Sequence, residues 1–571
     1  MSVLLVAVPV IVFALVWQYY AVNVPKWDDH ALRAYLYESD RETTLSGKIY
    51  QLFKQHNEHR IVYDRIVAAL DYRLFGKLSY VHLMIVGNLS LVGLLAIFGA
   101  VLLRAGKSVI YLLPVSLLLF NLSHWENMFW GMAALQNFSV VFWVIGAIYC
   151  LTHTNRWMLG LLLAVLATLT SGNGLLVWPV GFVLLALRPG NAELPGGPLG
   201  RRPVRPLTGW AVSAVVVIGL YFVGFSKPTS NPPLRGPVTD LLKGWLAFSG
   251  AAADVLPINP PVWISILLGS LMVLATLSLV AWGLMSHWTI ITRLVRRVRS
   301  PRRSGFGTAQ EIPAITLFFW GCSGFILGTA AIVAWTRTSF GIDLTITSRY
   351  KIYSLTLLAL LYVCTVSRLP KRAGQWVGAG GAVGSLLIAW LSYNSFLAEA
   401  IWWRHWMLTS QFNWTYSTDR PVGRLDAISK KYTTPAPAFY DADPAAVYDT
   451  GQPPPVPVII TKTPAGFELR QATLTAQDRR DSRSYVVARS PKRTYLFPTR
   501  QNQNLTGRMR LWPANGFTTG FTAPIAHVDL DAGTYRLFIL RVATDEKLTL
   551  HPTDQTIRSV GQVKTASGTN W

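Results

Sequence analysis

Two acidic residues near the N-terminus, Asp28 and Asp29, form the first pair of side chains that could do chemistry. They lie just beyond an apolar segment, within Trp27-Asp28-Asp29-His30. Carboxylates in such a place can remove a proton from an acceptor hydroxyl or hold a divalent cation against a phosphate. A helix N-cap followed by a solvated acidic turn explains the same pair without any reaction. We take Asp28 and Asp29 as the candidate catalytic residues and keep both explanations open.

A second polar cluster covers residues 55–60, with the sequence Gln-His-Asn-Glu-His-Arg. It interrupts the range 45–75, in which apolar residues recur at helical spacing, and we predict a helix along the membrane surface over this range. Side chains that snorkel to lipid headgroups explain some polar residues on an apolar face, but not several different kinds in a row. The sequence therefore predicts phosphate or sugar contacts from His56, Asn57, Glu58, His59 and Arg60.

Metal binding is an alternative use of the same cluster. His56, Glu58 and His59 carry suitable ligand atoms, but their spacing differs from the His-Glu-x-x-His arrangement of helical zinc sites. We rank a metal below phosphate or sugar contact. No cofactor is certain from these motifs, and a divalent cation is the alternative that stays open.

Two turns further along the chain add polar residues between apolar segments. The first contains Glu126 and Asn127, and the second contains Asn173 between two glycines. The tryptophans of these turns fit an aromatic belt at a membrane interface without any function. A carboxylate in so short and apolar a turn as that of Glu126 must find a partner or a watery cavity. We add Glu126, Asn127 and Asn173 to the predicted substrate-binding residues.

Basic residues also occur where a topology rule would not place them, at Arg337, Arg349 and Lys351. Arginine pairs bidentately with phosphate oxygens, so an anionic ligand would explain Arg337 and Arg349. Anchoring to ordinary anionic lipid explains Lys351 equally well. We predict that Arg337, Arg349 and the neighbouring Tyr350 belong to the substrate-binding set.

The elements that position these residues are apolar segments long enough to cross a membrane. Hydrophobic residues make up 51% of the 571 residues and charged residues only 14%, which excludes an ordinary soluble enzyme of this length. The net charge of +24 lies in loops between apolar blocks, not on a face that fits nucleic acid. About eleven spans are predicted, at residues 2–22, 80–103, 108–122, 137–152, 157–170, 174–187, 210–226, 262–285, 314–335, 351–366 and 376–398.

The basic loops predict the orientation of these spans. If the N-terminus is cytoplasmic, every predicted inner loop carries Lys or Arg, as the positive-inside rule requires. The odd number of spans then places the chain after Glu399 outside the cytoplasm. We therefore expect a bacterial inner-membrane protein with a transmembrane domain over 1–398, a first outer loop over 23–79, a linker over 399–452 and a β-rich domain over 453–571.

The C-terminal region shows short β-rich runs bounded by Gly, Pro, Asn and Asp. Their spacing predicts an antiparallel sandwich, with runs at Val456–Thr461, Tyr485–Ala488, Tyr495–Pro498, Ala526–Leu530 and Tyr535–Val542. The fold class expected overall is a mainly α-helical polytopic membrane protein with a C-terminal extracytoplasmic β-sandwich-like domain.

Five motifs in order resemble a set of bacterial multi-pass membrane proteins: Asp28-Asp29, Asn57-Glu58-His59-Arg60, Glu126-Asn127-Met128-Phe129-Trp130-Gly131, Gly172-Asn173-Gly174 to Trp178-Pro179, and Ser348-Arg349-Tyr350. Their plan is similar to the GT-C superfamily of polyprenyl-phosphate-dependent glycosyltransferases, with an acidic pair and juxtamembrane helices in the first outer loop. The resemblance covers the chain to about residue 399. It implies that Asp28 or Asp29 is the loop carboxylate and that Arg349 or Arg337 binds the carrier phosphate.

The expected function follows from this resemblance and from the polar clusters. We expect a glycosyltransferase of the cell envelope that moves a sugar from a polyprenyl-phosphate donor to a glycan or lipid acceptor, with membrane lipid around it and no nucleic-acid partner. Asp28 or Asp29 would deprotonate the acceptor while Arg349 and Arg60 hold the phosphate. A lipid-linked glycan transporter or flippase, a glycan ligase or polymerase, and an envelope scaffold are the alternatives.

Overall fold

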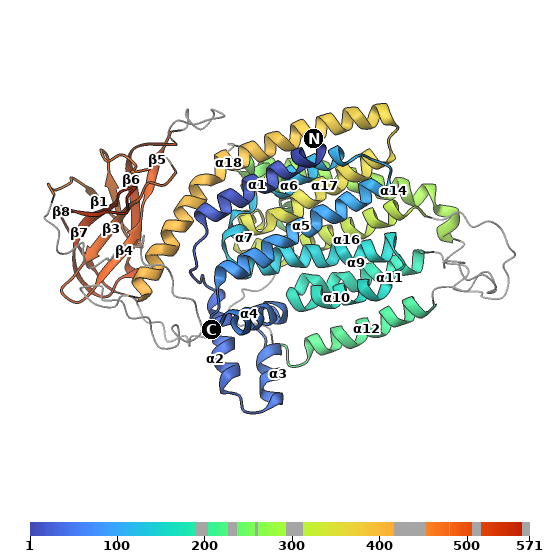
Figure 1. Ribbon diagram of the computed structural model, residues 1–571, viewed down its shortest axis with the longest axis horizontal. Helices are drawn as coiled ribbons and strands as arrows, with labels where there is room; N and C mark the ends of the chain where they lie inside the picture. The colour runs from blue at the N-terminus through green and yellow to red at the C-terminus, as the bar shows by residue number, and fades with distance from the viewer. Residues whose placement is uncertain are drawn as a thin grey trace. The chain divides into compact units, whose positions relative to one another are not determined.

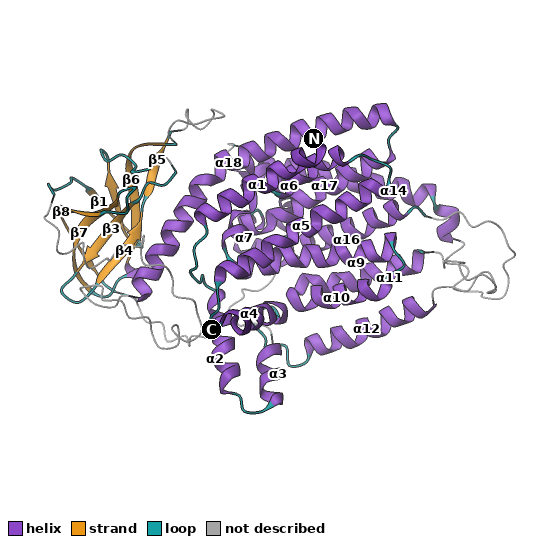
Figure 2. Ribbon diagram, viewed as in Figure 1, coloured by secondary structure: helices purple, strands orange, loops and turns teal. Residues whose placement is uncertain are grey.

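The computed structural model describes residues 1–188, 204–226, 237–256, 261–292, 312–415, 453–478, 480–504 and 516–561. Over these residues the chain is mostly helical, and a β-sheet region follows the helices (Figures 1 and 2). The described residues include nine helical stretches long and apolar enough to cross a membrane and two shorter apolar ones, Trp157–Thr170 and Gly172–Leu187. A mostly helical chain with several long apolar helices and a C-terminal β region is thus confirmed and is compatible with a membrane protein, while the number of spans stays a prediction.

The α-helices, with the bounds observed, are α1 (Ser2–Tyr20), α2 (Asp29–Arg41), α3 (Leu45–Phe53), α4 (Val62–Phe75), α5 (Tyr80–Arg104), α6 (Leu113–Leu119), α7 (Trp125–Phe129), α8 (Gly131–Ala133), α9 (Ser139–His153), α10 (Trp157–Thr170), α11 (Val177–Leu187), α12 (Val204–Phe222), α13 (Val238–Ser249), α14 (Pro261–Ser286), α16 (Ala314–Arg337), α17 (Lys351–Arg368) and α18 (Lys371–Thr415). The stretch predicted as a linker from residue 399 therefore begins as helix, up to Thr415.

By their contacts, these elements form two compact units. The helical unit contains Met1–Trp17, Glu42–Val67 and Leu83–Phe396. The β-containing unit contains Gln18–Arg41, Ala68–His82 and Leu397–Trp571. The first outer loop is thus divided between the two units, and each unit is considered by itself.

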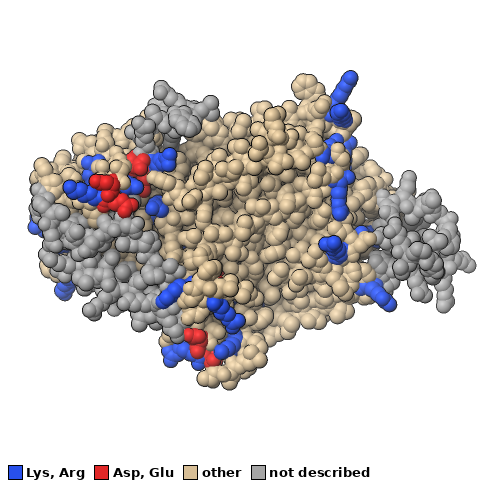
Figure 3. All heavy atoms as spheres, in the orientation of Figure 1, with Lys and Arg blue, Asp and Glu red and all other residues tan. Residues whose placement is uncertain are grey.

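Cations gather at one end of the helical unit and bind the carbonyls that end its helices. Arg104 donates to the carbonyl oxygen of His153, the last residue of α9, and Arg188 donates at 2.7 Å to that of Leu151. Lys107 Nζ lies 2.9 Å from the carbonyl oxygen of Leu369, just past α17. Cations are favoured there because a helix leaves its last carbonyls unpaired and partly negative. Figure 3 shows Lys and Arg along this basic end, beside a broad surface without charged residues on the face shown.

Glycine allows α13 and α14 to approach closely and so places the short 3₁₀ helix η5 (Ala251–Val255) that follows α13. A Cβ atom at Gly250 would lie 2.1 Å from the carbonyl oxygen of Ser265, and one at Gly269 would lie 1.8 Å from that of Leu246. No side chain larger than hydrogen fits these positions. Glycine here serves packing between apolar helices, where close backbone contact stabilises association.

The range 45–75 forms two helices rather than the single surface helix predicted. Helix α3 ends at Phe53, α4 begins at Val62, and the polar residues 55–60 lie in the turn between them. The backbone N–H and C=O groups of His56 and His59 bond each other at 2.9 Å, and Asn57 takes a positive φ of 47°. Asn tolerates that conformation better than most residues. The polar residues therefore do not interrupt a helix face, as the sequence suggested.

The β-containing unit holds two antiparallel four-stranded sheets that share one hydrophobic core. Their strand orders are β1-β2-β6-β5 and β4-β3-β7-β8, with bounds β1 (Ile459–Thr463), β2 (Gly466–Gln471), β3 (Ser484–Arg489), β4 (Thr494–Pro498), β5 (Arg500–Gln503), β6 (Phe517–Ala526), β7 (Gly533–Val542) and β8 (Leu548–Ser559). Side chains such as Leu469, Val486 and Ile539 from both sheets meet in the core. This is the arrangement of a β-sandwich.

The outer face of the second sheet is also buried, because α18 covers part of it. Val487 and Leu496, directly opposite each other on β3 and β4, point away from the sandwich core, and both are buried. The ring of His405 in α18 lies 4.8 Å from that of Tyr485 on the same face. Asn413 bonds both the N–H and the C=O of Leu496 at 2.8 Å. The helix therefore also covers the edge strand β4, whose open backbone groups would otherwise invite pairing.

The sequence identified some strands and missed others. The runs at 485–488, 495–498 and 535–542 lie within β3, β4 and β7. The run predicted at Ala526–Leu530 is wrong as a strand, since Ala526 ends β6 and a 3₁₀ turn, His527–Asp529, follows. Strands β2, β5 and β8 were not predicted, and neither was most of β6.

Cysteine labelling tests the orientation that the basic loops predict. All three native cysteines are buried, so they add little background. Arg156 at the basic end and Lys462 on β1 are both exposed. A membrane-impermeant maleimide should label Lys462→Cys in intact spheroplasts and Arg156→Cys only after permeabilisation. Labelling of both variants in intact spheroplasts, or of neither variant before permeabilisation, would contradict the predicted orientation.

Candidate functional site

Three ion pairs lie within the helical unit at the end opposite the basic end: Arg337 with Glu58, Arg349 with Glu126 and Lys351 with Asp254. We call them the paired-charge cluster. All three cations are the ones that run against the topology rule. Each carboxylate comes from an apolar stretch or a turn elsewhere in the chain, so the fold brings the opposite charges together. Pairing lowers the cost of holding a charge in apolar surroundings.

Arg337 and Glu58 form a half-open pair at the C-terminal end of α16. Nη2 of Arg337 lies 3.1 Å from Oε2 of Glu58, and the side chains are 32% and 25% exposed. Tyr350 also lies close enough to Arg337 to interact with it electrostatically. This contact connects two residues, Arg337 and Tyr350, that the sequence assigned to substrate binding without placing them together. The guanidinium is thus oriented yet still accessible.

Arg349 is held loosely through its side chain and firmly through its backbone. Its Nε lies 3.7 Å from Oε2 of Glu126, beyond hydrogen-bond range, and the side chains are 35% and 15% exposed. The backbone carbonyl of Arg349 accepts a 3.0 Å hydrogen bond from Asn127, and its guanidinium lies 5.5 Å from the ring centre of Trp130. Among the described residues, Nε has no hydrogen-bond partner although it is buried. A ligand oxygen could therefore bind there.

In the third pair, Lys351 is almost fully enclosed, whereas the side chain of Asp254 is 18% exposed. Lys351 Nζ bonds the carboxylate of Asp254 and lies 3.9 Å from the ring centre of Phe396. Asp254 belongs to η5, which is also fixed by a 3.1 Å bond from the N–H of Ala252 to Ser354. The sequence missed Asp254, because no motif surrounds it. A lone carboxylate in an apolar run was the available signal, as it was for Glu126.

The polar turn between α3 and α4 uses Arg60 for a structural contact. Its guanidinium donates to the backbone carbonyls of Tyr221 and Val223 at the end of α12 and of Phe53 at the end of α3. The side chain is buried. Arg60 therefore satisfies carbonyls that two helix ends leave unpaired. The sequence assigned Arg60 to phosphate binding, but most of its guanidinium group already donates to these carbonyls.

The Gly172-Asn173-Gly174 turn packs against this polar turn. A Cβ atom at Gly172 would lie 3.0 Å from Nδ1 of His59, and one at Gly174 would lie 2.0 Å from the carbonyl oxygen of Ala167. Asn173 donates a 2.8 Å hydrogen bond to the hydroxyl of Tyr353 on α17. Gly174 is thus required for close approach, whereas a Cβ at Gly172 would only press against the His59 ring. Asn173 joins the turn to the helix that begins with Lys351.

The acidic pair belongs to the β-containing unit. Asp29 begins α2, is fully buried, and accepts a 3.0 Å hydrogen bond from the backbone N–H of Lys26, whereas Asp28 is only partly buried. The ammonium of Lys26 lies 3.2 Å from the ring centre of Trp403 and 4.2 Å from that of Trp406. Asp29 therefore has a clear structural role at a helix start, and Asp28 is the more accessible carboxylate.

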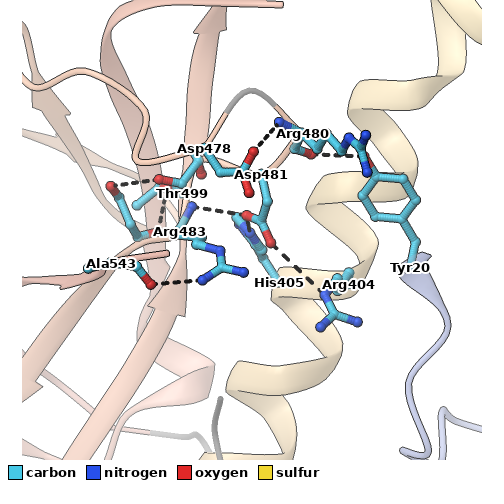
Figure 4. A network of polar contacts seen from close by, with 11 residues as sticks. Tyr20, Arg404, His405, Asp478, Arg480, Asp481, Arg483, Thr499 and Ala543 are labelled. Carbon is cyan, nitrogen blue, oxygen red and sulfur yellow. Dashed lines mark hydrogen bonds and ion pairs between the residues drawn. The ribbon is translucent and has the colours of Figure 1, made fainter. Parts of the chain in front are cut away.

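A buried network around Asp481 ties α18 to the loop before β3 (Figure 4). Asp481 bonds His405 and accepts a 2.9 Å hydrogen bond from the N–H of Arg483, while Arg404 lies 4.0 Å away. Burial alone would raise the pKa of the Asp481 carboxyl, but His405, the Arg483 N–H and Arg404 together hold it at about 2. The carboxylate thus stays ionised. This network anchors a domain and carries no open site.

The substrate-binding residues predicted from sequence all lie in the helical unit, and several are joined there: Glu58 to Arg337, Arg337 to Tyr350, and Glu126 and Asn127 to Arg349. His56, Asn57 and Glu58 stand in the polar turn, with Arg60 turned to backbone carbonyls. No group of three or more His, Cys, Asp or Glu that could hold a metal ion occurs among the described residues. The cluster can bind and orient an anion through its guanidinium groups.

Comparison of the chain with protein-family models, with curated proteins and with solved structures gave no match. The geometry of the two units therefore carries the functional argument. The paired-charge cluster contains two partly exposed cations, Arg337 and Arg349. The networks around the buried side chains of Arg60 and Asp481 stabilise the fold of their own units.

Replacing Arg60 separates a scaffold role from a ligand role. Arg60→Lys keeps the charge but loses the planar guanidinium that reaches three carbonyls. We therefore expect a lower melting temperature for the ligand-free protein. A hydrogen bond from a charged group contributes about 1.5–3 kcal/mol, and at least one should be lost. The measurement is thermal unfolding in detergent, with Lys48→Arg on the exposed side of α3 as the control. An unchanged melting temperature would return Arg60 to the ligand-binding set.

Proposed function

We propose that this chain is a membrane glycosyltransferase that moves a sugar from a polyprenyl-phosphate-linked donor to a glycan or lipid acceptor outside the cytoplasm. The observation that carries the proposal is the half-open state of two guanidinium groups, Arg337 and Arg349, at the end of the helices opposite the basic end. Carrier lipids expose their phosphate where such helix ends meet the headgroups. The proposal includes a GT-C-like arrangement of about eleven membrane spans.

The internal carboxylates explain how these cations can persist without a ligand. Glu58 and Glu126 keep Arg337 and Arg349 paired in the free protein. The 3.7 Å separation at Arg349 is too long for a hydrogen bond, so a phosphate can bind the exposed part of its guanidinium without first breaking one. Partial pairing thus lowers the reorganisation needed when an anion binds.

The proposed reaction is displacement at the sugar carbon that bears the phosphate. The acceptor oxygen forms the new glycosidic bond as its proton passes to a carboxylate base. The carbon–oxygen bond to phosphate breaks, and the polyprenyl phosphate leaves with the electron pair. Arg349 and Arg337 neutralise the charge that grows on the leaving phosphate. The base, Asp28 or Asp29, is a hypothesis from the sequence alone, and within the β-containing unit Asp28 is the more exposed of the two.

Donor binding tests the role of the guanidinium groups. Arg349→Ala should lower the affinity for polyprenyl phosphate by about one to two decades, since a charge-assisted hydrogen bond contributes about 1.5–3 kcal/mol. Arg349→Lys should fall between Arg349→Ala and the native protein, because it keeps the charge without the fork. Binding is measured on purified protein in detergent by native mass spectrometry with a short-chain polyprenyl phosphate.

Arg156→Ala, an exposed cation at the basic end, is the matched control and should bind as the native protein does. Native affinity in Arg349→Ala would move the phosphate site to Arg337. Native affinity in both Arg349→Ala and Arg337→Ala would remove the phosphate from the proposal. A radiolabelled donor that crosses the membrane without forming a new glycosidic bond would favour a flippase instead.

The acidic pair is tested by comparing two isosteric changes. Asp28→Asn should abolish sugar transfer with little effect on stability, because Asp28 is partly exposed. Asp29→Asn should lower stability by about 0.3–1 kcal/mol, because it removes a negative charge from the first turn of α2. Transfer is followed by incorporation of labelled sugar, and stability by thermal unfolding. Full transfer by Asp28→Asn would exclude this carboxylate as the base.

A further inference from the structure

A row of amide side chains lies beside Arg349 in the helical unit. Asn127 donates to the backbone carbonyl of Arg349 at 3.0 Å, and its own Oδ1 accepts a 3.0 Å hydrogen bond from Asn137. Asn88 on α5 donates a 3.2 Å hydrogen bond to the carbonyl of Met128, next to Asn127. These amides are therefore connected to the cation that the proposed function assigns to phosphate.

A short π-helix contains Asn137 of this row and, next to it in the sequence, a further amide, Gln136. Residues Ala134–Phe138 form π-helical backbone just before α9. The wider turn changes the direction of its side chains relative to a regular helix, and such segments are frequent at functional sites. Gln136 and Asn137 lie within it. A Cβ atom at Gly87 would lie 2.4 Å from the carbonyl carbon of Ala134, so Gly87 lets α5 approach this segment and brings Asn88 with it.

Two atoms of this amide row have hydrogen-bonding capacity that the described part of the chain does not meet. Nε2 of Gln136 is a buried donor without a partner there, and Oδ1 of Asn88 is a buried acceptor without one. A buried polar atom without a partner is costly, so most are satisfied in native proteins. A hydroxyl group both donates and accepts, and it can meet either need.

We propose that Asn88, Asn127, Gln136 and Asn137 form the subsite for the hydroxyl groups of the donor sugar, next to the phosphate at Arg349. The inference rests on the proposed function and names the part of the donor that these side chains bind. None of the four side chains is charged, and Glu126 lies by Arg349. The subsite therefore fits a neutral sugar and disfavours one that carries a carboxylate.

Gln136→Leu tests the subsite because it separates stability from binding. Nε2 of Gln136 has no partner among the described residues, so its removal should leave the melting temperature of the ligand-free protein unchanged or higher. Affinity for a short-chain polyprenyl-phosphate glucose should fall about three- to tenfold, the effect of one or two hydrogen bonds. Affinity for the same polyprenyl phosphate without sugar should not change. Gln136→Ala is the second variant, with the same expected binding result.

Asn155→Ala, an exposed amide at the basic end, is the control and should bind both lipids as the native protein does. Equal native-like binding of both lipids by Gln136→Leu and Gln136→Ala would overturn the subsite, since water would then satisfy these atoms. A lower melting temperature with equal loss for both lipids would show a structural role and also overturn it. Stronger binding of a glucuronate-bearing lipid than of the glucose-bearing lipid would overturn the preference for a neutral sugar.

The same measurements distinguish this subsite from the proposed function. If the native protein binds polyprenyl phosphate but gains nothing from the sugar, the subsite is excluded and the phosphate site stands. If the native protein binds neither lipid, the proposed function fails and the subsite with it.

Discussion

This structure depends on one constraint, that charged side chains in an apolar environment need partners. The helical unit keeps most charged residues at the ends of its helices, and those that are enclosed have partners. At the basic end, Arg and Lys bind the last carbonyls of α9 and α17. At the opposite end, each cation of the paired-charge cluster has a carboxylate from a distant part of the sequence. The same requirement thus fixes the helix ends and assembles the candidate site.

The three ion pairs differ in how far their side chains are buried. This difference separates a structural pair from the pairs of the candidate site. Lys351 is enclosed, and its pair with Asp254 fixes η5 against α17. Arg349 and Glu126 are partly open and too far apart for a hydrogen bond. A buried pair is expensive to break, whereas an exposed or loose one exchanges partners readily. Asn127 holds the backbone carbonyl of Arg349, so a fixed backbone carries a guanidinium that can change partners.

The sequence predicted the features that depend on composition and missed those that depend on distant contacts. Spans and basic loops follow from apolar runs and charge, and the apolar turn around Glu126 indicated that this carboxylate needs a partner or a watery cavity. Asp254 has no motif, and only the folded chain shows it beside Lys351. The broken helix at 55–60 depends on carbonyls of α12 that Arg60 binds. Strand β8 contains Pro552, which argues against a central strand, and it is an edge strand here.

The β-containing unit draws its residues from both ends of the chain, and this has a consequence for biosynthesis. The hydroxyl of Tyr20, at the end of the first helix, donates a 2.8 Å hydrogen bond to the carbonyl of Arg480, 460 residues later. Contacts between such distant residues form late, because the loop that joins them must close first. The segment 18–41 therefore cannot complete these contacts until the residues after 397 have been synthesised. A chaperone or quality-control protease would meet this segment before its partner strands exist.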